Sequence, residues 1–342
     1  MDFYVNRSCP RNCAQCLAKN VKLRRSILTV DEWDKVFSFI EDSFGGVGFY
    51  QNLGIESLFY PWAIEWIKMM NERGRNYTLY TTFPPQIMKE SFVKELVKAE
   101  PIGFAGGTDY TPNMPKEVIA EDYDQLQKTL DVVNWSRYFV REGAVKDIEF
   151  TVTLNKKNFR YVKDIVLWLS EQLPEATIGI AIVHWSVDGK HDLYPRLSEM
   201  WDYAITPDIA GEFKRVMYEF ADWVRDNKDV NVVVPPTFIR WLGDAGWRLG
   251  FNPMDCDRQI TLEADGRFRL CLYRPGEKVN EITIFDVMSG RISWDEVFSI
   301  MFKEARKCPG CAWNCKWVAK MYGEEAYYIK HSREWWDKMG IW

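Results

Sequence analysis

Short apolar runs alternate along the first part of the chain with longer segments in which apolar residues recur at helical spacing. Each short run is bounded by glycine, proline or polar residues, as strands usually are. The predicted strands are residues 3–5, 47–50, 77–82, 102–105, 147–154 and 178–183. The last run, from Ile178 to Val183, is apolar on both faces, which is typical of a strand in a sheet that is covered on each side.

The helical segments that follow these strands are predicted from their periodicity and their end signals. Thr29 and Glu32 form a capping box that opens the first helix, and Gly45-Gly46 ends it. Pro84-Pro85 is expected to open a later helix. The predicted helices are residues 29–44, 58–73, 84–96, 118–141, 159–173 and 207–227. Six β-α units result, which implies a parallel sheet with right-handed crossovers, either an open doubly wound sheet or a barrel.

The pattern changes after about residue 228. A short Trp-rich helix is expected before Cys256, and two strand-like runs then flank Asp265-Gly266, a dipeptide typical of a two-residue hairpin turn. A turn centred there would place Cys271 opposite residue 260. Ser293 and Glu296 form a second capping box, which predicts a helix up to about residue 305.

Composition narrows the class of protein. Of the 342 residues, 47% are hydrophobic and 27% charged, as in a soluble globular protein, and the length suits either one large domain plus a small one or a single barrel-sized domain. The net charge of −5 argues against a nucleic-acid-binding surface. No apolar run is long enough to span a bilayer, and the first residues lack the apolar stretch of a signal peptide, so a cytoplasmic location is expected.

The eight cysteines fall into two groups, because residues 17–255 contain none. Disulfide frameworks are normally spread through much shorter secreted chains, so this grouping favours two metal clusters instead. Since the chain has only three histidines, sites that need several histidine ligands are nearly excluded. The first group is Cys9, Cys13 and Cys16, and the second is Cys256, Cys271, Cys308, Cys311 and Cys315.

The first cysteine group has C-x3-C-x2-C spacing in one loop directly after the first predicted strand. Three thiolates suit a soft metal or an iron–sulfur cluster. Because a four-iron cluster takes four thiolates, this loop would leave one iron open to a substrate or cofactor. The alternatives are a structural zinc completed by a distant ligand, or thiols that bind nothing.

This motif, followed by β-α repeats, resembles the radical S-adenosylmethionine (SAM) superfamily. The resemblance implies an α/β fold, a partial (β/α)6 TIM-type barrel, here with a small C-terminal α+β cluster-binding extension. It divides the chain into a core barrel (1–205), connecting helices (206–255), an auxiliary cluster domain (256–320) and an aromatic helical tail (321–342). Cys9, Cys13 and Cys16 would hold the SAM-binding 4Fe-4S cluster.

The resemblance also implies SAM contacts. Glu56, in the place of the family's Gly-Gly-Glu-Pro stretch, would bind the SAM ammonium, although it could instead be a glutamate that favours a helix N-terminus. Thr81, Thr82 and Thr153, at the ends of two predicted strands, would be further SAM contacts, although they could equally reflect the preference of threonine for strands. Two departures from the family pattern are Gln15, where many members carry an aromatic residue, and Ile55 after Gly54. The implied SAM-binding residues are Gln15, Gly54, Glu56, Thr81, Thr82, Thr153 and Asn155.

The second cysteine group resembles the SPASM/twitch extension, whose members bind auxiliary iron–sulfur clusters. The resemblance implies one auxiliary 4Fe-4S cluster, with structural zinc as the alternative. Its four ligands would be Cys256, Cys271, Cys308 and Cys311, and Cys315 is a fifth thiol whose role stays open.

The implied activity is that of a radical SAM oxidoreductase, which cleaves SAM reductively to a 5′-deoxyadenosyl radical that abstracts hydrogen from the substrate. An external electron donor such as flavodoxin or ferredoxin would be its partner. SPASM/twitch enzymes most often modify a peptide or protein; a sugar alcohol, another small molecule or a lipid is the alternative. His184 and Asp188, at the end of the sixth strand, are candidate substrate contacts. A different class, a non-catalytic zinc or iron–sulfur protein, also remains open.

Overall fold

A computed structural model describes residues 1–6, 9–11, 13, 27–52, 56–183, 202–244, 260–270 and 278–306. Within them, six parallel strands lie side by side in chain order. They are β1 (Asp2–Phe3), β2 (Tyr50–Asn52), β3 (Tyr77–Tyr80), β4 (Gly103–Gly107), β5 (Asp147–Leu154) and β6 (Thr177–Ile182).

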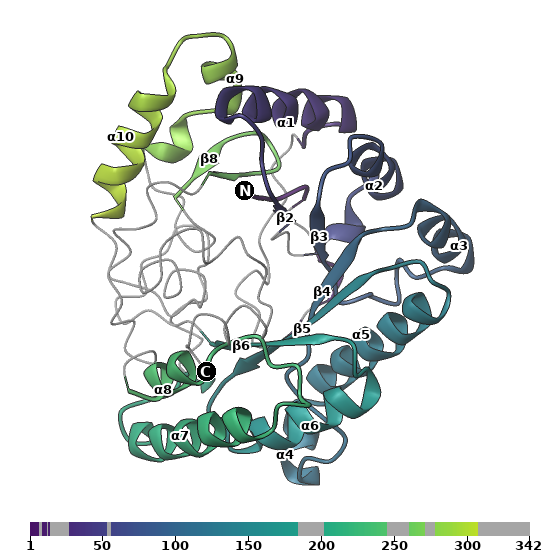
Figure 1. Ribbon diagram of the computed structural model, residues 1–342, viewed down its shortest axis with the longest axis vertical. Coiled ribbons are helices and arrows are strands. Elements are labelled where there is room, and N and C mark those ends of the chain that lie inside the picture. The colour runs from purple at the N-terminus through teal and green to yellow at the C-terminus, as the bar shows by residue number, and fades with distance from the viewer. Residues whose placement is uncertain are drawn as a thin grey trace.

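The helices follow the strands as the sequence predicts, and most of them cover one side of the curved sheet (Figure 1). They are α1 (Val30–Phe44), α2 (Ala63–Glu72), α3 (Glu90–Ala99), α4 (Lys116–Glu121), α5 (Tyr123–Arg141), α6 (Val162–Gln172), α7 (Ala210–Asp226), α8 (Pro236–Asp244), α9 (Ile284–Met288) and α10 (Trp294–Ala305). Short 3-10 turns are η1 (Ser57–Phe59), η2 (Phe159–Tyr161) and η6 (Val279–Glu281).

The strand order decides between the two architectures that the sequence leaves open. A doubly wound sheet reverses its strand order, so its helices cover both faces. Here β1 to β6 follow each other without reversal, and successive right-handed crossovers then place the helices on the same face. The sheet is therefore a partial (β/α)6 barrel, as expected.

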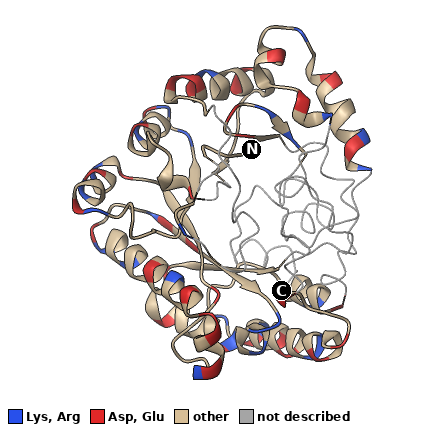
Figure 2. Cartoon of the chain, turned by 180° about the vertical axis from the view of Figure 1, so that it is seen from behind, with Lys and Arg blue, Asp and Glu red and all other residues tan. Residues whose placement is uncertain are grey.

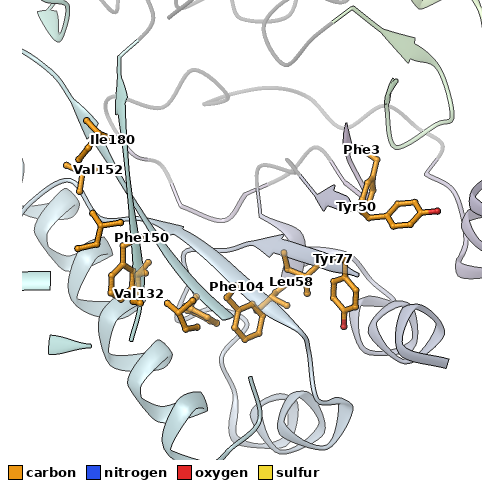
Figure 3. Packing of buried hydrophobic residues seen from close by; sticks show 14 of the residues in the cluster. Phe3, Tyr50, Leu58, Tyr77, Phe104, Val132, Phe150, Val152 and Ile180 are labelled. Atoms are coloured by element: carbon orange, nitrogen blue, oxygen red, sulfur yellow. The ribbon is translucent and has the colours of Figure 1, made fainter. Parts of the chain in front are cut away.

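The core lies between this sheet and its helices. Phe104 of β4 packs against Phe139 of α5 with ring centroids 5.5 Å apart, and Phe3 of β1 packs against Trp33 of α1 at the same distance. Figure 3 shows other buried side chains of the same core together with Phe3 and Phe104, from Phe3 at one end of the sheet to Ile180 at the other. A Cβ on Gly106 would lie 2.7 Å from a methyl group of Val132, so only glycine lets α5 approach β4 this closely.

Both predicted capping boxes are present. The Thr29 side chain accepts the N–H of Glu32, whose carboxylate accepts the N–H of Thr29, and α1 ends at Gly45 in the left-handed conformation. Ser293 and Glu296 make the same reciprocal bonds at the start of α10. These helix ends are set by local sequence, which is why they could be predicted.

The hairpin around Asp265-Gly266 forms, but in a different register. β7 (Thr261–Leu262) pairs in parallel with β1 and antiparallel with β8 (Phe268–Arg269). Thr261 lies opposite Arg269, which puts Ile260 opposite Leu270 instead of Cys271. The Gly266 N–H donates to Glu263 O and Gly266 adopts a φ of 79°, so the loop has three residues and ends in a left-handed glycine.

Other boundaries also differ from the predictions, among them the start of the second strand and the start of the third helix. The second strand begins at Tyr50 and not at residue 47, because Gly45 and Gly46 with positive φ are needed to turn the chain back from α1. The helix expected at Pro84-Pro85 begins only at Glu90. The N–H of Ile87 closes a turn onto Pro84 O, and the N–H of Lys89 bonds to Ile87 O, which interrupts a continuing helix.

Positively and negatively charged residues are interspersed along the outer helices, whereas the strands carry few charged residues (Figure 2). None of the helices that the structure describes is long and apolar enough to cross a membrane.

Candidate functional site

The first cysteine segment follows β1 and therefore lies at the carboxyl end of the sheet. Cys9 and Cys13 are both partly exposed. Two neighbouring cysteines at the carboxyl end of a parallel barrel fit an iron–sulfur cluster, since barrel enzymes place their sites at this end. Three other predicted site residues, Gln15, Cys16 and Gly54, lie outside the described residues.

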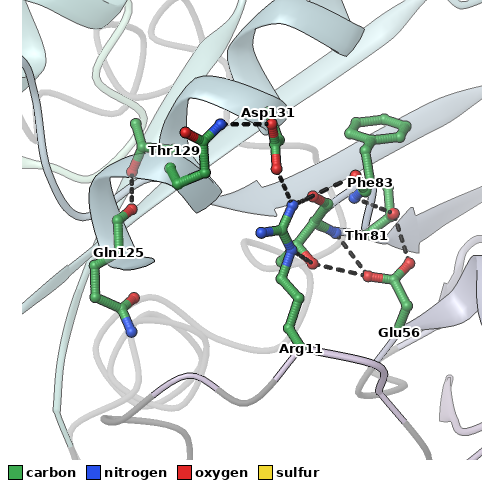
Figure 4. Close-up of polar contacts among 9 residues, drawn as sticks. Arg11, Glu56, Thr81, Phe83, Gln125, Thr129 and Asp131 are labelled. Atoms are coloured by element: carbon green, nitrogen blue, oxygen red, sulfur yellow. Dashed lines mark hydrogen bonds and ion pairs between the residues drawn. The ribbon is translucent and has the colours of Figure 1, made fainter. Parts of the chain in front are cut away.

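Glu56 lies just beyond the end of β2, where it caps η1, and it is completely buried. Its Oε1 accepts the Thr81 hydroxyl at 2.6 Å and the Leu58 N–H at 3.4 Å. Its Oε2 accepts the Thr82 N–H at 2.9 Å and the Thr82 hydroxyl at 3.0 Å (Figure 4). The structure therefore brings together three predicted SAM contacts, from the ends of two neighbouring strands.

These bonds occupy the acceptor positions of the Glu56 carboxylate, which has about four lone-pair sites. Burial raises the pKa of Glu56, and the hydrogen bonds from Thr81, Thr82 and Leu58 oppose that rise because they favour the ionised form. An ammonium can bind Glu56 only if one of the threonine hydroxyls turns away from it. In this arrangement Glu56 holds the ends of β2 and β3 together.

The backbone after β3 makes a sharp bend that allows these contacts. Phe83 adopts a φ of 47°, a left-handed conformation that is rare outside glycine, and its N–H donates to the Thr81 hydroxyl at 3.0 Å. The Phe83 ring is buried against Phe104 and Phe139, with centroid distances of 5.1 and 5.6 Å. Packing of this ring fixes the bend, and the bend directs both threonines to Glu56.

Arg11 connects the cysteine segment to this bend. Its Nε donates to Thr82 Oγ1 at 3.1 Å, and its Nη2 donates to Thr82 O at 3.0 Å. The same guanidinium forms an ion pair with Asp131 of α5 (Figure 4). Neither Arg11 nor Asp131 stands out in the sequence as a site residue. Only the position of Arg11 between two cysteines could have pointed to it.

The other predicted SAM contacts form a separate group at the end of β5. The Thr153 N–H donates to Asp109 Oδ1 at 2.7 Å, and Asp109 forms a buried ion pair with Lys128 Nζ at 2.5 Å. The Asn155 side chain accepts the N–H groups of Lys157 and Asn158 and so closes the turn after β5. Asn155 therefore has a structural role in this turn.

The face of the sheet opposite the helices is lined by polar and small residues. A Cβ on Gly107 would lie 2.8 Å from the Tyr80 hydroxyl, and one on Gly179 would lie 3.2 Å from Glu149 Oε1, so these side chains share this inner face. Along β5, alternate residues are apolar and buried on the helix side, and those between them are polar: Asp147, Glu149, Thr151 and Thr153. A barrel packed for stability alone fills its interior with branched apolar residues, so this inner face suits a bound polar molecule.

Several predicted positions cannot be compared with the structure because they fall outside the described residues. They are the substrate contacts His184 and Asp188 and the second cysteine group, Cys256, Cys271, Cys308, Cys311 and Cys315. Two of these cysteines are close in sequence to described strands: Cys256 precedes β7, which begins at Thr261, and Cys271 follows β8, which ends at Arg269.

Comparison with known proteins identifies the fold. No protein-family model matches the chain, and no curated protein matches it either. Streptococcus suis SuiB bound to S-adenosylmethionine is similar in structure, with a TM-score of 0.63 and 13% sequence identity over 97% of this chain and 76% of SuiB. SuiB bound to its precursor peptide SuiA gives a TM-score of 0.60 at 14% identity, over 97% of this chain and 75% of SuiB. The chain therefore has the fold of SuiB, and the fold implied by the cysteine motif is confirmed.

Proposed function

We propose that this chain is a radical SAM enzyme in which Cys9, Cys13 and Cys16 hold a 4Fe-4S cluster. The observation that carries the proposal is the place of Cys9 and Cys13, on a segment that is bonded through Arg11 to the carboxyl end of β3, in a chain with the fold of SuiB. When bound, the cluster and SAM supply the one-electron chemistry that removes a hydrogen atom from an unactivated carbon. The protein orients the substrate and excludes water.

The residues proposed for SAM divide into two groups. Glu56, Thr81 and Thr82 lie together beside the cysteine segment. Thr153 and Asn155 lie at the end of β5, three strands away from β2. Such a separation would let one elongated cofactor contact several strand ends, as is usual at the carboxyl face of a barrel.

We propose an oxidoreductase that acts on a peptide or protein, with an external flavodoxin or ferredoxin as electron donor. SuiB, which shares the fold, binds a precursor peptide. The polar inner face, with Tyr80, Glu149 and Thr151, supports a substrate rich in hydrogen-bonding groups and disfavours a lipid. A small polar molecule such as a sugar alcohol is the second candidate, because the same lining would bind hydroxyl groups.

A second, auxiliary 4Fe-4S cluster in a SPASM/twitch-like domain is also part of the proposal. Its support is the hairpin of β7 and β8, which extends the barrel sheet at β1 and ends two positions before Cys271. The proposed ligands are Cys256, Cys271, Cys308 and Cys311, and Cys315 is the alternative ligand. Four protein ligands would leave this cluster without an open iron, which favours electron transfer as its role.

The decisive experiment is anaerobic reconstitution with iron and sulfide, followed by metal analysis and incubation with SAM and a reductant. Two four-iron clusters predict about eight irons per chain, and turnover predicts the release of 5′-deoxyadenosine. A variant with Cys9, Cys13 and Cys16 replaced by Ala should retain about half of the iron and release no 5′-deoxyadenosine. Stoichiometric zinc without iron in the wild-type protein would contradict the proposal and favour a structural zinc protein.

A further inference from the structure

Arg11 connects the cysteine segment to the barrel. Its guanidinium meets three oxygen atoms of the bend after β3: Thr82 Oγ1 at 3.1 Å, Thr82 O at 3.0 Å and Phe83 O at 3.4 Å. It also forms an ion pair with Asp131 on α5. These partners lie 71 to 120 positions away from Arg11 along the chain.

The partners of Arg11 are themselves held in place. Asp131 accepts the side-chain amide of Gln127, one turn earlier in α5, at 3.0 Å on its other oxygen. The Thr82 hydroxyl accepts Arg11 Nε, so its own proton is directed to the buried carboxylate of Glu56. Only 11% of the Arg11 side chain and 15% of the Asp131 side chain are exposed. The attachment is thus a partly buried network and not a surface ion pair.

The shape of arginine matters for this role. A guanidinium presents five N–H donors in a rigid plane and can reach carbonyl, hydroxyl and carboxylate groups at the same time. A lysine ammonium carries the same charge but is a compact point charge on a flexible stem, so it could not meet Thr82 and Asp131 with the same fixed geometry.

We propose that Arg11 is a positioning residue for the first cysteine group: it fastens the chain beside Cys9 and Cys13 to the bend after β3 and to α5, and it keeps these two thiols in place before the cluster is assembled. The inference rests on the proposed function, because it takes these thiols to be cluster ligands. Since Thr82 also binds Glu56, the same network joins the cysteine segment to the carboxylate at the end of β2.

The first test uses the full-length protein without its cluster. Iodoacetamide alkylation of Cys9 and Cys13 is followed by mass spectrometry in the wild type and in Arg11→Met, Arg11→Lys and Asp131→Asn. Loss of a partly buried charged hydrogen bond corresponds to about a tenfold change in the opening of the segment. We expect both thiols to react about tenfold faster in Arg11→Met and clearly faster in Arg11→Lys and Asp131→Asn.

The matched control is Arg160→Met. Arg160 donates to Glu212 Oε1 at 2.7 Å in an arginine–carboxylate pair between η2 and α7, and it contacts no part of the cysteine segment in the described structure. This variant should leave the reactivity of Cys9 and Cys13 unchanged. Circular dichroism of each variant reports whether the barrel is folded, and if Arg11→Met is unfolded, the inference is judged by Arg11→Lys and Asp131→Asn.

The second test reads the cluster itself. After reconstitution, iron per chain and the electron paramagnetic resonance spectrum of the reduced protein are compared between the wild type and the Arg11 variants. We expect less iron and a broadened spectrum in Arg11→Met, only partly restored in Arg11→Lys. Wild-type thiol reactivity and iron content in Arg11→Met would overturn the inference. Wild-type values of both quantities in Arg11→Lys would overturn it as well. A wild-type protein that binds no iron would instead overturn the proposed function.

Discussion

Thr82 offers a sharp test of how the end of β3 is held. Its hydroxyl donates to Glu56 Oε2 at 3.0 Å and accepts Arg11 Nε at 3.1 Å, and the residue is 7% exposed. Thr82→Val keeps the shape of the side chain and removes both interactions. The backbone N–H of residue 82 still donates to Glu56, so the carboxylate keeps three of its four donors.

The expected loss follows from the charge of the acceptor. A hydrogen bond to a charged group contributes about 1.5–3 kcal/mol, whereas a bond between neutral groups contributes about 0.5–1.5 kcal/mol. We therefore expect the free energy of unfolding of Thr82→Val to fall by about 2–3 kcal/mol. The matched control is Thr177→Val, since the Thr177 hydroxyl donates to a neutral acceptor, Ile148 O, at 3.2 Å. Its loss should be about 1 kcal/mol.

The assay is denaturant unfolding of the cluster-free protein, followed by circular dichroism at several pH values. Burial raises the pKa of Glu56 above that of the unfolded chain, so ionisation of Glu56 costs stability as the pH rises through the folded-state pKa. The Thr82 hydroxyl favours the ionised carboxylate, and its removal raises that pKa further. The deficit of Thr82→Val should accordingly be smallest below the unfolded glutamate pKa of about 4.3 and should grow as the pH rises through the folded-state pKa of Glu56.

Two results would refute this reasoning. One is a loss in Thr82→Val that equals the loss in Thr177→Val, because the charge of Glu56 would then add nothing. The other is a deficit that does not change with pH, which would mean that the hydroxyl does not bond to the ionised carboxylate.

Three further predictions concern the same end of the barrel. Lys128→Met removes the ion-pair partner of the buried Asp109 and should lower the free energy of unfolding by about 3–5 kcal/mol. A second substitution, Asp109→Asn, should restore part of this loss. No recovery in the double variant would argue against the ion pair. Glu56→Gln removes the raised pKa, so its stability relative to the wild type should increase from acid to neutral pH, and a parallel pH dependence of the two proteins would contradict this. Gly106→Ala places a Cβ 2.7 Å from a methyl group of Val132 and 2.9 Å from the backbone oxygen of Thr81, which should lower stability in thermal unfolding by about 1–3 kcal/mol. Val132→Ala should relieve only part of this loss. Full relief would exclude the clash with the backbone oxygen.

The sequence determined the features that depend on local interactions. Strand β5 forms over the predicted residues 147–154, and α1 and α10 begin at their predicted capping boxes. Apolar periodicity and side-chain capping act over a few residues, so they can be recognised without knowledge of the fold. The cysteine motif is equally local, and the fold that it implied is the fold observed.

Boundaries were predicted less well where tertiary packing competes with local preference. Pro84-Pro85 carries a good helix-start signal, but the buried ring of Phe83 bends the chain there and α3 begins at Glu90. The hairpin register shifted by one residue because Gly266 adopts a left-handed conformation in a three-residue loop. The start of α3 depends on the left-handed conformation of Phe83, and the hairpin register depends on that of Gly266. Neither conformation is required by the local sequence.

By itself, then, the sequence determined six β-α units, their capped helices and a loop of closely spaced thiols. Only the tertiary structure decided that the strands form a sequentially ordered partial barrel, that Glu56 is saturated by Thr81 and Thr82, and that Arg11 reaches Asp131 from 120 positions away. The physical reason is range: periodicity and caps are set by neighbours along the chain, whereas these contacts exist only because parallel strands bring their carboxyl ends to one edge.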